Sequence, residues 1–446
     1  MEPDFSGIVI LTSDRPLLTR IRDRVWPTLP TTLDNNIRLL YIEIFFAAVM
    51  GGVAGFNSAF AVRLGATNAE IGLLNSVPPL IAAVLFIPAA RFLERQADRR
   101  PYILWSLLLY RLGYLGVALM PIIAPANTAT WVVIWLILLN APATMFVAGW
   151  NPLIADILPE RRRAFVFSRR NIINFSVAAI VAFLAGRYLS AAAFPYNYMT
   201  IYAFGAAAAL VSSAIVEQLR MPKTEVIAER RKTQQRIRIP HVSWVEFRRI
   251  QTQGNRAFRV MTFNSLIFNF GAWMSMPLFI LYYLRVLNAD DGWIGLHSAF
   301  GSGATVVGYY VWERVIRQRG FTWVLMRTIP FSPIYVFLIV LFPSLTPILF
   351  FHALVGFINS GLDLSHFNVL LKLCPRERRT SYLGYYNTIM NGVMFLAPLV
   401  SVALADRIGL GEALFVSGVV RLVGGLLFWV LRVHEPPEEP WTPSEA

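Results

Sequence analysis

The chain has 446 residues, 56% of them apolar and only 15% charged, and its mean hydropathy is +0.54. A soluble domain carries about 45–50% apolar and about 25% charged residues, so this composition excludes an ordinary water-soluble globule. The formal net charge of +14 does not indicate a nucleic-acid partner, because the basic residues lie in short loops rather than on one face.

The first elements in the chain are a basic segment, residues 1–37, and a set of apolar runs long enough to cross a bilayer as helices. Within the basic segment, Pro16 to Trp26 has its apolar residues on one helical face and is predicted to lie on the membrane surface. Six spans are then predicted near 38–62, 71–92, 102–123, 131–151, 170–190 and 199–219.

A hydrophilic loop, 220–257, separates these spans from a second set. The second six are predicted near 258–284, 292–314, 323–343, 347–371, 382–405 and 412–432. We therefore predict an all-α membrane protein of twelve transmembrane helices, with one six-helix bundle over 38–219, a second over 258–432, and a short tail at 433–446.

The distribution of basic residues predicts the orientation of these spans. Most of the 40 Lys and Arg residues lie in alternate loops, and the loops on the opposite side hold only Arg63, Arg187, Arg285 and Arg407. By the positive-inside rule, both termini and the central loop are predicted to be cytoplasmic. We expect a multi-pass protein of the plasma (inner) membrane, surrounded by lipid.

The two sets of spans resemble each other at three separated places, in the same order and at nearly constant offset. Such self-similarity predicts two pseudosymmetric bundles with a substrate site near the midplane between them. The matching pairs are Ile71-Gly72-Leu73 with Ile294-Gly295-Leu296, Glu94-Arg95 with Glu313-Arg314, and Pro159, Arg162, Arg163 and Asn171 with Pro375, Arg378, Arg379 and Asn387.

Over essentially 38–432 the chain resembles the major facilitator superfamily of secondary transporters. The loop between the second and third spans is similar to a signature of that family, with Glu94-Arg95 for its Asp-Arg pair and Arg99-Arg100 for its basic pair, and Glu313-Arg314 repeats it. The resemblance implies that these charges pair across the cytoplasmic ends of the helices and hold the outward-facing state closed inside. The alternative is ordinary positive-inside charge at the membrane surface. The predicted cytoplasmic gate comprises Glu94, Arg95, Arg99, Arg100, Glu313 and Arg314.

The tenth predicted span carries polar residues at helical spacing. His352, Gly356, Asn359, Asp363 and His366 are three or four residues apart, which places them on one face. The resemblance implies that the first, fourth, seventh and tenth helices line the cavity, so we predict that Asp363 binds a proton or a substrate cation and that His366 tunes it. The alternative is a ladder of hydrogen bonds between helices.

Glu43 in the first span has two interpretations: a buried carboxylate that is protonated during transport, or an ion pair with a neighbouring arginine. Arg111 and Arg421, in the third and twelfth spans, are predicted to turn toward protein, with Glu43 or Asp363 as the first partners to test. The remaining predicted binding residues are uncharged and lie in the first, fourth and seventh spans: Asn57, Asn140, Thr144, Asn264 and Asn269.

Together these features predict a secondary active transporter that moves a small or amphipathic solute by alternating access, with protons as the candidate coupling ion. No cofactor or metal is predicted, because the chain has no phosphate-cradling nucleotide motif and its one cysteine, Cys374, cannot form a cysteine-cluster metal site. No loop gathers catalytic groups, so an enzyme is not predicted. The alternative is a membrane scaffold or assembly factor built on a transporter fold.

Overall fold

The computed structural model describes residues 32–96, 98–220, 250, 256–375 and 378–431, and every regular element within them is helical. The predicted surface helix at Pro16 to Trp26, nearly all of the central loop 220–257 and the tail 433–446 lie outside the described residues.

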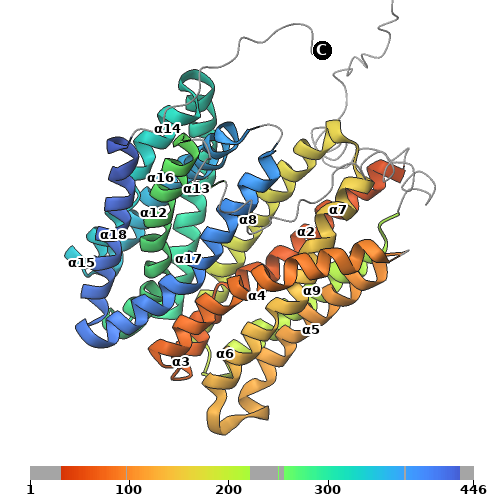
Figure 1. The fold of residues 1–446 in the computed structure, drawn as a ribbon. Coiled ribbons are helices and arrows are strands. Elements are labelled where there is room, and N and C mark those ends of the chain that lie inside the picture. The colour runs from red at the N-terminus through yellow and green to blue at the C-terminus, as the bar shows by residue number, and fades with distance from the viewer. Residues whose placement is uncertain (1–31, 97, 221–249, 251–255, 376–377, 432–446) are drawn as a thin grey trace, which may run out of the picture.

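The first six predicted spans correspond to helices α2 to α9, and two of these spans are each broken into two helices (Figure 1). The first span breaks at Gly55-Phe56 and the fourth at Leu139. The elements are α2 (Thr32–Ala54), α3 (Asn57–Arg63), α4 (Asn68–Arg95), α5 (Arg100–Ile123), η1 (Pro125–Asn127), α6 (Thr128–Leu138), α7 (Asn140–Ile157), α8 (Glu160–Ala191) and α9 (Tyr196–Glu217).

The second six spans correspond to α12 to α18. α12 continues into a π-helical turn, η2, and the ninth span is two short helices joined by the 3₁₀ turn η3. The elements are α12 (Arg256–Leu281), η2 (Tyr282–Val286), α13 (Asp291–Arg319), α14 (Phe321–Thr328), η3 (Ile329–Phe331), α15 (Ile334–Leu341), α16 (Leu345–Leu373), α17 (Arg379–Ile408) and α18 (Leu410–Val430).

Eleven helical segments in the described part are long and apolar enough to cross a membrane, so the chain is a multi-pass membrane protein. The predicted eighth span, 292–314, corresponds to the twelfth long helix, α13, which does not meet that composition criterion. α13 packs on both α8 and α16, and these protein neighbours reduce the need for apolar side chains that face lipid.

One predicted boundary is wrong in a way that matters below. The sequence predicts the basic run 161–170 as a loop before the fifth span, but this run forms the first turns of α8, which begins at Glu160. Arginine has good helix propensity, so the helix extends beyond the apolar run. Arg170 consequently lies on a helix and is buried.

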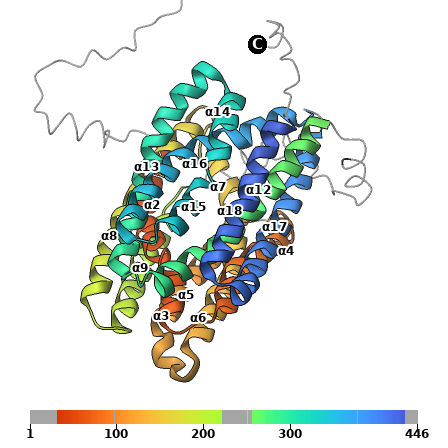
Figure 2. The ribbon, with the colours of Figure 1, turned by 90° about the vertical axis from the view of Figure 1, so that its left-hand side faces the viewer.

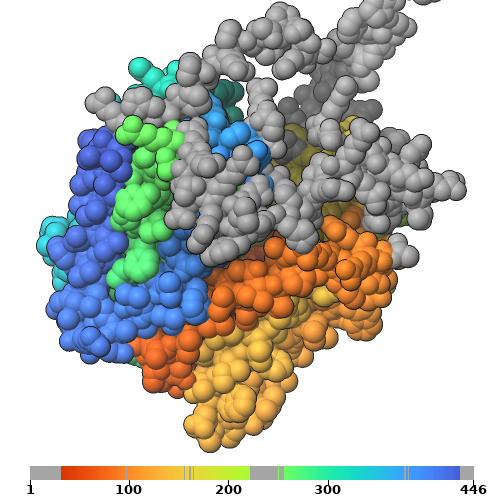
Figure 3. All heavy atoms as spheres, viewed as in Figure 1, coloured from red at the N-terminus to blue at the C-terminus, as the bar shows by residue number. Residues whose placement is uncertain are grey.

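The two bundles meet along two helix pairs: α4 lies against α17, and α8 lies against α13. Figure 2 shows these pairs on opposite sides of the molecule, and in Figure 3 the orange surface of α4 adjoins the blue surface of α17. Glycines permit the close approach. A Cβ on Gly72 would lie 2.6 Å from Val402 Cγ2, and one on Gly295 would lie 2.4 Å from the Ala182 carbonyl oxygen.

Polar contacts also join the bundles, and they gather at one end of the molecule. Arg63 donates to the Ala289 carbonyl at 2.7 Å, and its Nε lies 3.5 Å from Asp291 Oδ1, which also accepts from the Tyr198 hydroxyl at 2.7 Å. Asn68 donates to Asp406 at 2.6 Å, and Ser190 donates to Asp290 at 2.8 Å. Arg285 donates to the Ala66 carbonyl. We call this set the interhalf cluster: Arg63, Asn68, Ser190, Tyr198, Arg285, Asp290, Asp291 and Asp406.

Candidate functional site

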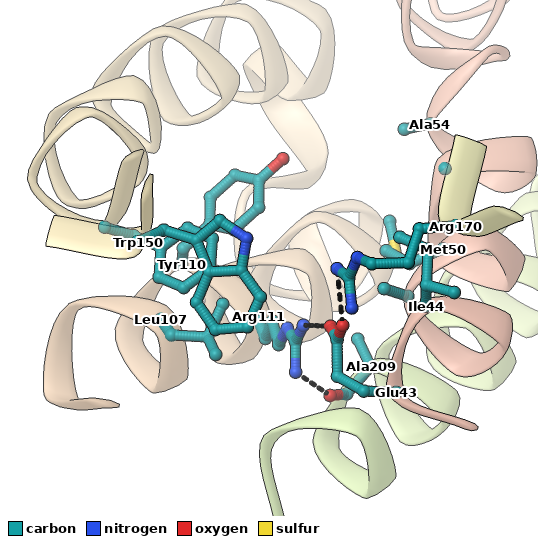
Figure 4. A pocket seen from close by; sticks show the side chains of 13 residues that line it. Glu43, Ile44, Met50, Ala54, Leu107, Tyr110, Arg111, Trp150, Arg170 and Ala209 are labelled. Carbon is teal, nitrogen blue, oxygen red and sulfur yellow. Dashed lines mark hydrogen bonds and ion pairs between the residues drawn. The ribbon is translucent and has the colours of Figure 1, made fainter. Parts of the chain in front are cut away.

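A cavity of about 240 Å³ lies inside the N-terminal bundle, among α2, α5, α7, α8 and α9 (Figure 4). One wall carries the aromatic side chains of Tyr110, Phe146 and Trp150. The other lining residues are Glu43, Ile44, Ala47, Met50, Gly51, Ala54, Leu107, Arg111, Arg170 and Ala209. Every lining residue comes from the first bundle, whereas the sequence predicted a site shared between the two.

Glu43 lies on α2 between two arginines. Its Oε2 is 2.8 Å from Nη2 of Arg170 on α8, and its Oε1 is 3.4 Å from Nη2 of Arg111 on α5. Ser212 on α9 donates to Oε1 at 2.9 Å. All three charged side chains are at least 93% buried. Of the two interpretations of Glu43, the structure shows the ion pair, and Arg111 pairs with Glu43, one of the two partners named for it.

Backbone oxygens hold both arginines in place. Arg111 Nη1 donates to the Ala209 carbonyl at 2.7 Å and to Ser213 Oγ at 2.9 Å. Arg170 Nη1 donates to the Leu40 carbonyl at 2.6 Å, and its guanidinium lies 5.4 Å from the centre of the Trp150 ring. A guanidinium can satisfy several acceptors at once, and a ring face adds cation–π attraction. The arrangement fixes two positive groups beside an aromatic wall.

Arg170 is the site residue that the sequence analysis missed. The positive charge count assigned it to a cytoplasmic loop, because it is the last residue of a basic run. Its helical register carries a partial signal: Arg169 and Arg170 are adjacent and must face different sides of a helix. Arg169 is exposed, with its guanidinium 4.2 Å from the Phe165 ring centre, while Arg170 points inward.

The uncharged residues predicted in the N-terminal bundle make contacts outside this cavity. Asn57 accepts from the Tyr202 hydroxyl at 2.9 Å and donates to the Tyr114 hydroxyl at 3.5 Å. Asn140 donates to Leu136 O at 2.9 Å, one turn earlier, and Thr144 donates to Asn140 O at 2.7 Å. None of them lines the cavity.

In the C-terminal bundle, the predicted stripe on α16 faces several neighbours. His352 Nδ1 lies 2.9 Å from the His297 carbonyl on α13, Asn359 accepts from Ser332 beyond η3, and His366 Nε2 lies 2.9 Å from Ser265 Oγ on α12. Asp363 is exposed; the Tyr309 hydroxyl hydrogen-bonds its carboxylate, and Arg421 acts on it electrostatically.

The two asparagines predicted on α12 serve helix contacts. Asn264 is fully buried and donates to the Leu427 carbonyl of α18 at 3.2 Å, while its own Oδ1 has no hydrogen-bond partner. Asn269 donates to Ser265 O on its own helix at 2.8 Å. Arg421 lies over the Phe268 ring, 4.9 Å from its centre.

The C-terminal bundle contains a second polar network. The sequence contains its histidines and tyrosines, but no spacing pattern indicated that they lie together. His297 Nε2 lies 2.7 Å from the Tyr335 hydroxyl, which is also 2.7 Å from the Tyr283 hydroxyl. The His297 and His352 rings stack at 3.7 Å between centres. Helical segments that are distant in sequence meet here, which only packing could reveal.

The contacts that the structure shows for the predicted gate residues each lie within one bundle. Glu94, Arg95 and Arg314 are exposed, and Glu313 pairs with Arg317 one turn away on the same helix at 3.2 Å. Arg99 pairs with Asp156 at the end of α7, and Arg100 donates to the Glu217 carbonyl at the end of α9. These last two contacts join helix ends within the N-terminal bundle.

No group of three His, Cys, Asp or Glu side chains that could hold a metal ion occurs among the described residues. The cavity lining offers charge and aromatic surface for recognition. Two guanidiniums, one carboxylate and three rings can bind a polar or charged solute with a flat or apolar body.

Comparisons with known proteins place this geometry in context. The family model described as Major Facilitator Superfamily matches residues 39–330 and 261–446. The search of curated protein sequences gives no match.

Among solved structures, a mutant of the nucleoside transporter NupG is similar with a TM-score of 0.67 and 15% identity, over 89% of this chain and 100% of that one. A bacterial homologue of the iron transporter ferroportin in the inward-facing state has a TM-score of 0.67 and 12% identity, over 93% and 99%. The inward-open xylose transporter XylE from E. coli is similar with a TM-score of 0.63 and 12% identity, over 92% of this chain and 97% of that one.

Proposed function

Because the chain belongs to the major facilitator superfamily, a family of secondary transporters, we propose that it moves a small or amphipathic solute by alternating access and that the cavity around Glu43 binds this solute. Two pseudosymmetric bundles that rock against each other are the usual basis of such transport. The cavity supports the assignment because it concentrates charge inside a membrane-spanning bundle, where ionisable groups mark substrate or ion pathways.

The observation that carries the proposal is the position of the interhalf cluster. Its residues lie in or beside the loops between the first and second, fifth and sixth, seventh and eighth, and eleventh and twelfth spans. These are the loops that the positive-inside rule places outside the cell. We infer that the structure is an inward-facing state whose outer end is closed, and the exposed positions of Glu94, Arg95 and Arg314 agree with an open cytoplasmic end.

For proton coupling we propose Asp363 rather than Glu43. Glu43 is held between two guanidiniums and serves as their counter-charge. Asp363 is exposed, and among the described residues it makes no ion pair within 4.0 Å. A carboxylate that is accessible and is held by a hydrogen bond from Tyr309 rather than by an ion pair can bind and release a proton during a cycle.

Flux through reconstituted protein tests the proposal. The full chain in liposomes is given labelled nucleosides, sugars, organic anions and organic cations, with and without an imposed pH gradient, beside protein-free liposomes. We expect at least one solute to accumulate and the gradient to increase its accumulation. Asp363→Asn should abolish the gradient-driven part while leaving solute exchange intact.

Two results would count against these assignments. If folded, reconstituted protein moves no solute of the panel, the scaffold alternative is favoured. If Asp363→Asn leaves gradient-driven accumulation unchanged, Asp363 is not the coupling residue.

A further inference from the structure

The charges around the cavity do not balance. Of the thirteen lining residues, Arg111 and Arg170 are cationic and Glu43 is the one acid, so the lining carries a net charge of one positive unit. Both guanidiniums lie within a membrane-spanning bundle, where a charge without a counter-charge is costly. Backbone carbonyls lower this cost but carry no full charge.

Two acids of the described part of this bundle, Asp156 and Asp34, do not remove the surplus. Asp156 is paired with Arg99, and Asp34 with Arg162 at 3.1 Å. Each of these acids therefore neutralises an arginine other than the two in the cavity. The remaining polar lining group, Tyr110, is uncharged at neutral pH and lies on the aromatic wall.

Resting on the proposed function, we propose that the transported solute is a monoanion, such as a carboxylate, attached to a flat or apolar body. Arg111 is the group that receives the anion. Its Nη2 donates to Glu43 Oε1 at 3.4 Å, longer than a good charged hydrogen bond, whereas Arg170 Nη2 lies 2.8 Å from Oε2 as an ion pair without hydrogen-bond geometry. The closer charge contact keeps Arg170 on Glu43, so Arg111 is the guanidinium more readily redirected. Guanidinium suits carboxylate because its planar donors match the two oxygens.

The aromatic wall indicates the shape and polarity of the uncharged part of the solute. Tyr110, Phe146 and Trp150 stand opposite the apolar residues of α2, as Figure 4 shows for Trp150, Tyr110 and Met50. A cavity of about 150 Å³ already holds benzene in another protein, and this one measures about 240 Å³. One ring bearing one carboxylate therefore fits both the volume and the charge.

Three ligands of matched shape test the charge requirement: benzoate, benzamide and benzylamine, which carry negative, zero and positive charge at neutral pH. Equilibrium binding of each radiolabelled ligand to purified full-length protein in neutral detergent is the measurement. We expect benzoate to bind at least tenfold more tightly than benzamide, and benzylamine to show no specific binding. Equal binding of benzoate and benzamide would overturn the proposal.

Variants that remove and then restore the net positive charge of the lining test whether this charge, rather than one particular side chain, causes the preference for an anion. Arg111→Gln makes the lining neutral and should reduce the preference for benzoate over benzamide to less than threefold. Adding Glu43→Gln to that variant restores one positive unit and should restore the preference, because Arg170, no longer paired with Glu43, then receives the anion in place of Arg111. Arg111→Lys, which keeps the charge, is the matched control and should retain it. A double variant that stays indifferent to charge would overturn the proposal.

Two further outcomes separate this proposal from the proposed function. If benzoate binds selectively but crosses no liposome, anion recognition stands and transport fails. If a neutral or cationic solute is transported and benzoate does not bind, transport stands and the anion fails. If Arg111→Gln does not fold, Glu43→Gln alone carries the test, because a lining with two positive units should bind the dianion phthalate at least tenfold more tightly than the unaltered chain does.

Discussion

At the scale of single residues, neighbours in sequence can have opposite environments. Arg169 is exposed beside Phe165, whereas Arg170 is buried between Glu43 and the Leu40 carbonyl. Consecutive side chains on a helix point about 100° apart. This rotation is enough for one arginine to face the membrane surface while the next faces the interior of the bundle. This pair provides a matched comparison of a buried and an exposed arginine.

We expect Arg170→Gln to destabilise the protein and Arg169→Gln to change its stability little. Removing one partner of a buried ion pair costs about 3–5 kcal/mol, because the other charge is left uncompensated. Thermal unfolding of the two variants in detergent, followed by tryptophan fluorescence, measures the difference. Equal melting temperatures would show that Glu43 does not depend on Arg170.

Cys374 provides a pH-dependent test outside the spans. Its thiol is 4% exposed and donates to the Leu370 carbonyl at 3.2 Å, and burial raises its pKa to about 11. The reactive thiolate is therefore scarce at pH 7 and increases as the pH rises toward 11. We expect iodoacetamide to label Cys374 more slowly than Glu94→Cys, an exposed position, at both pH 7 and pH 9.5, and the Cys374 rate to keep rising above pH 9.5 where the Glu94→Cys rate levels off. Rapid labelling of Cys374 at pH 7 would contradict its burial.

At the scale of elements, the repeat found in the sequence coincides with the contacts between bundles. Gly72 and Gly295 are equivalent positions in the Ile-Gly-Leu repeats, and each lies where a helix of one bundle crosses a helix of the other. Gly72 meets Val402 on α17, and Gly295 meets Ala182 and Gly186 on α8. The repeat therefore marks the two crossings that a rocking motion must preserve or open.

We expect Gly295→Val to hold the outer end open. Its Cβ would lie 2.4 Å from the Ala182 carbonyl oxygen, and backbone cannot move aside as a side chain can. Gly303→Val on the same helix is the control, because nothing lies within 4 Å of its added Cβ. The readout is the labelling of Ala289→Cys, a buried position in the closed end, by a membrane-impermeant maleimide.

The expected result is fast labelling of Ala289→Cys with Gly295→Val and slow labelling with Gly303→Val. If both variants label at the rate of the parent carrying Ala289→Cys alone, the close approach of α13 and α8 does not keep the outer end shut.

At the scale of the whole molecule, the orientation that we propose rests on the distribution of charge and can be checked directly. In a Cys374→Ser background, we expect Glu94→Cys and Glu313→Cys to react only with reagent on the cytoplasmic side, and Arg187→Cys only with reagent outside. All three positions are exposed, so access depends on sidedness. The measurement is impermeant-maleimide labelling of right-side-out and inverted vesicles, and the reverse pattern would refute the positive-inside assignment.

The twelve helices and their division into two sets were predictable because a bilayer imposes one requirement everywhere. Each crossing must be apolar, about 20 residues long and internally hydrogen-bonded, and this pattern is local in sequence. Helix ends were less predictable. Where α8 begins depends on the helix propensity of its basic first turns rather than on hydropathy, so Arg170 was assigned to a loop.

The sequence by itself determined the membrane class, the helical fold and the duplication, and it limited the first candidate partners of Arg111 to Glu43 and Asp363. Each of these follows from composition, periodicity, or the cost of an unpaired charge in a membrane. Only the tertiary structure decided which residues surround the cavity, that its lining lies within one bundle and has surplus positive charge, and that the interhalf cluster joins the two bundles at one end. The physical reason is that these properties depend on the relative rotation and packing of helices from distant parts of the chain, which local patterns do not encode.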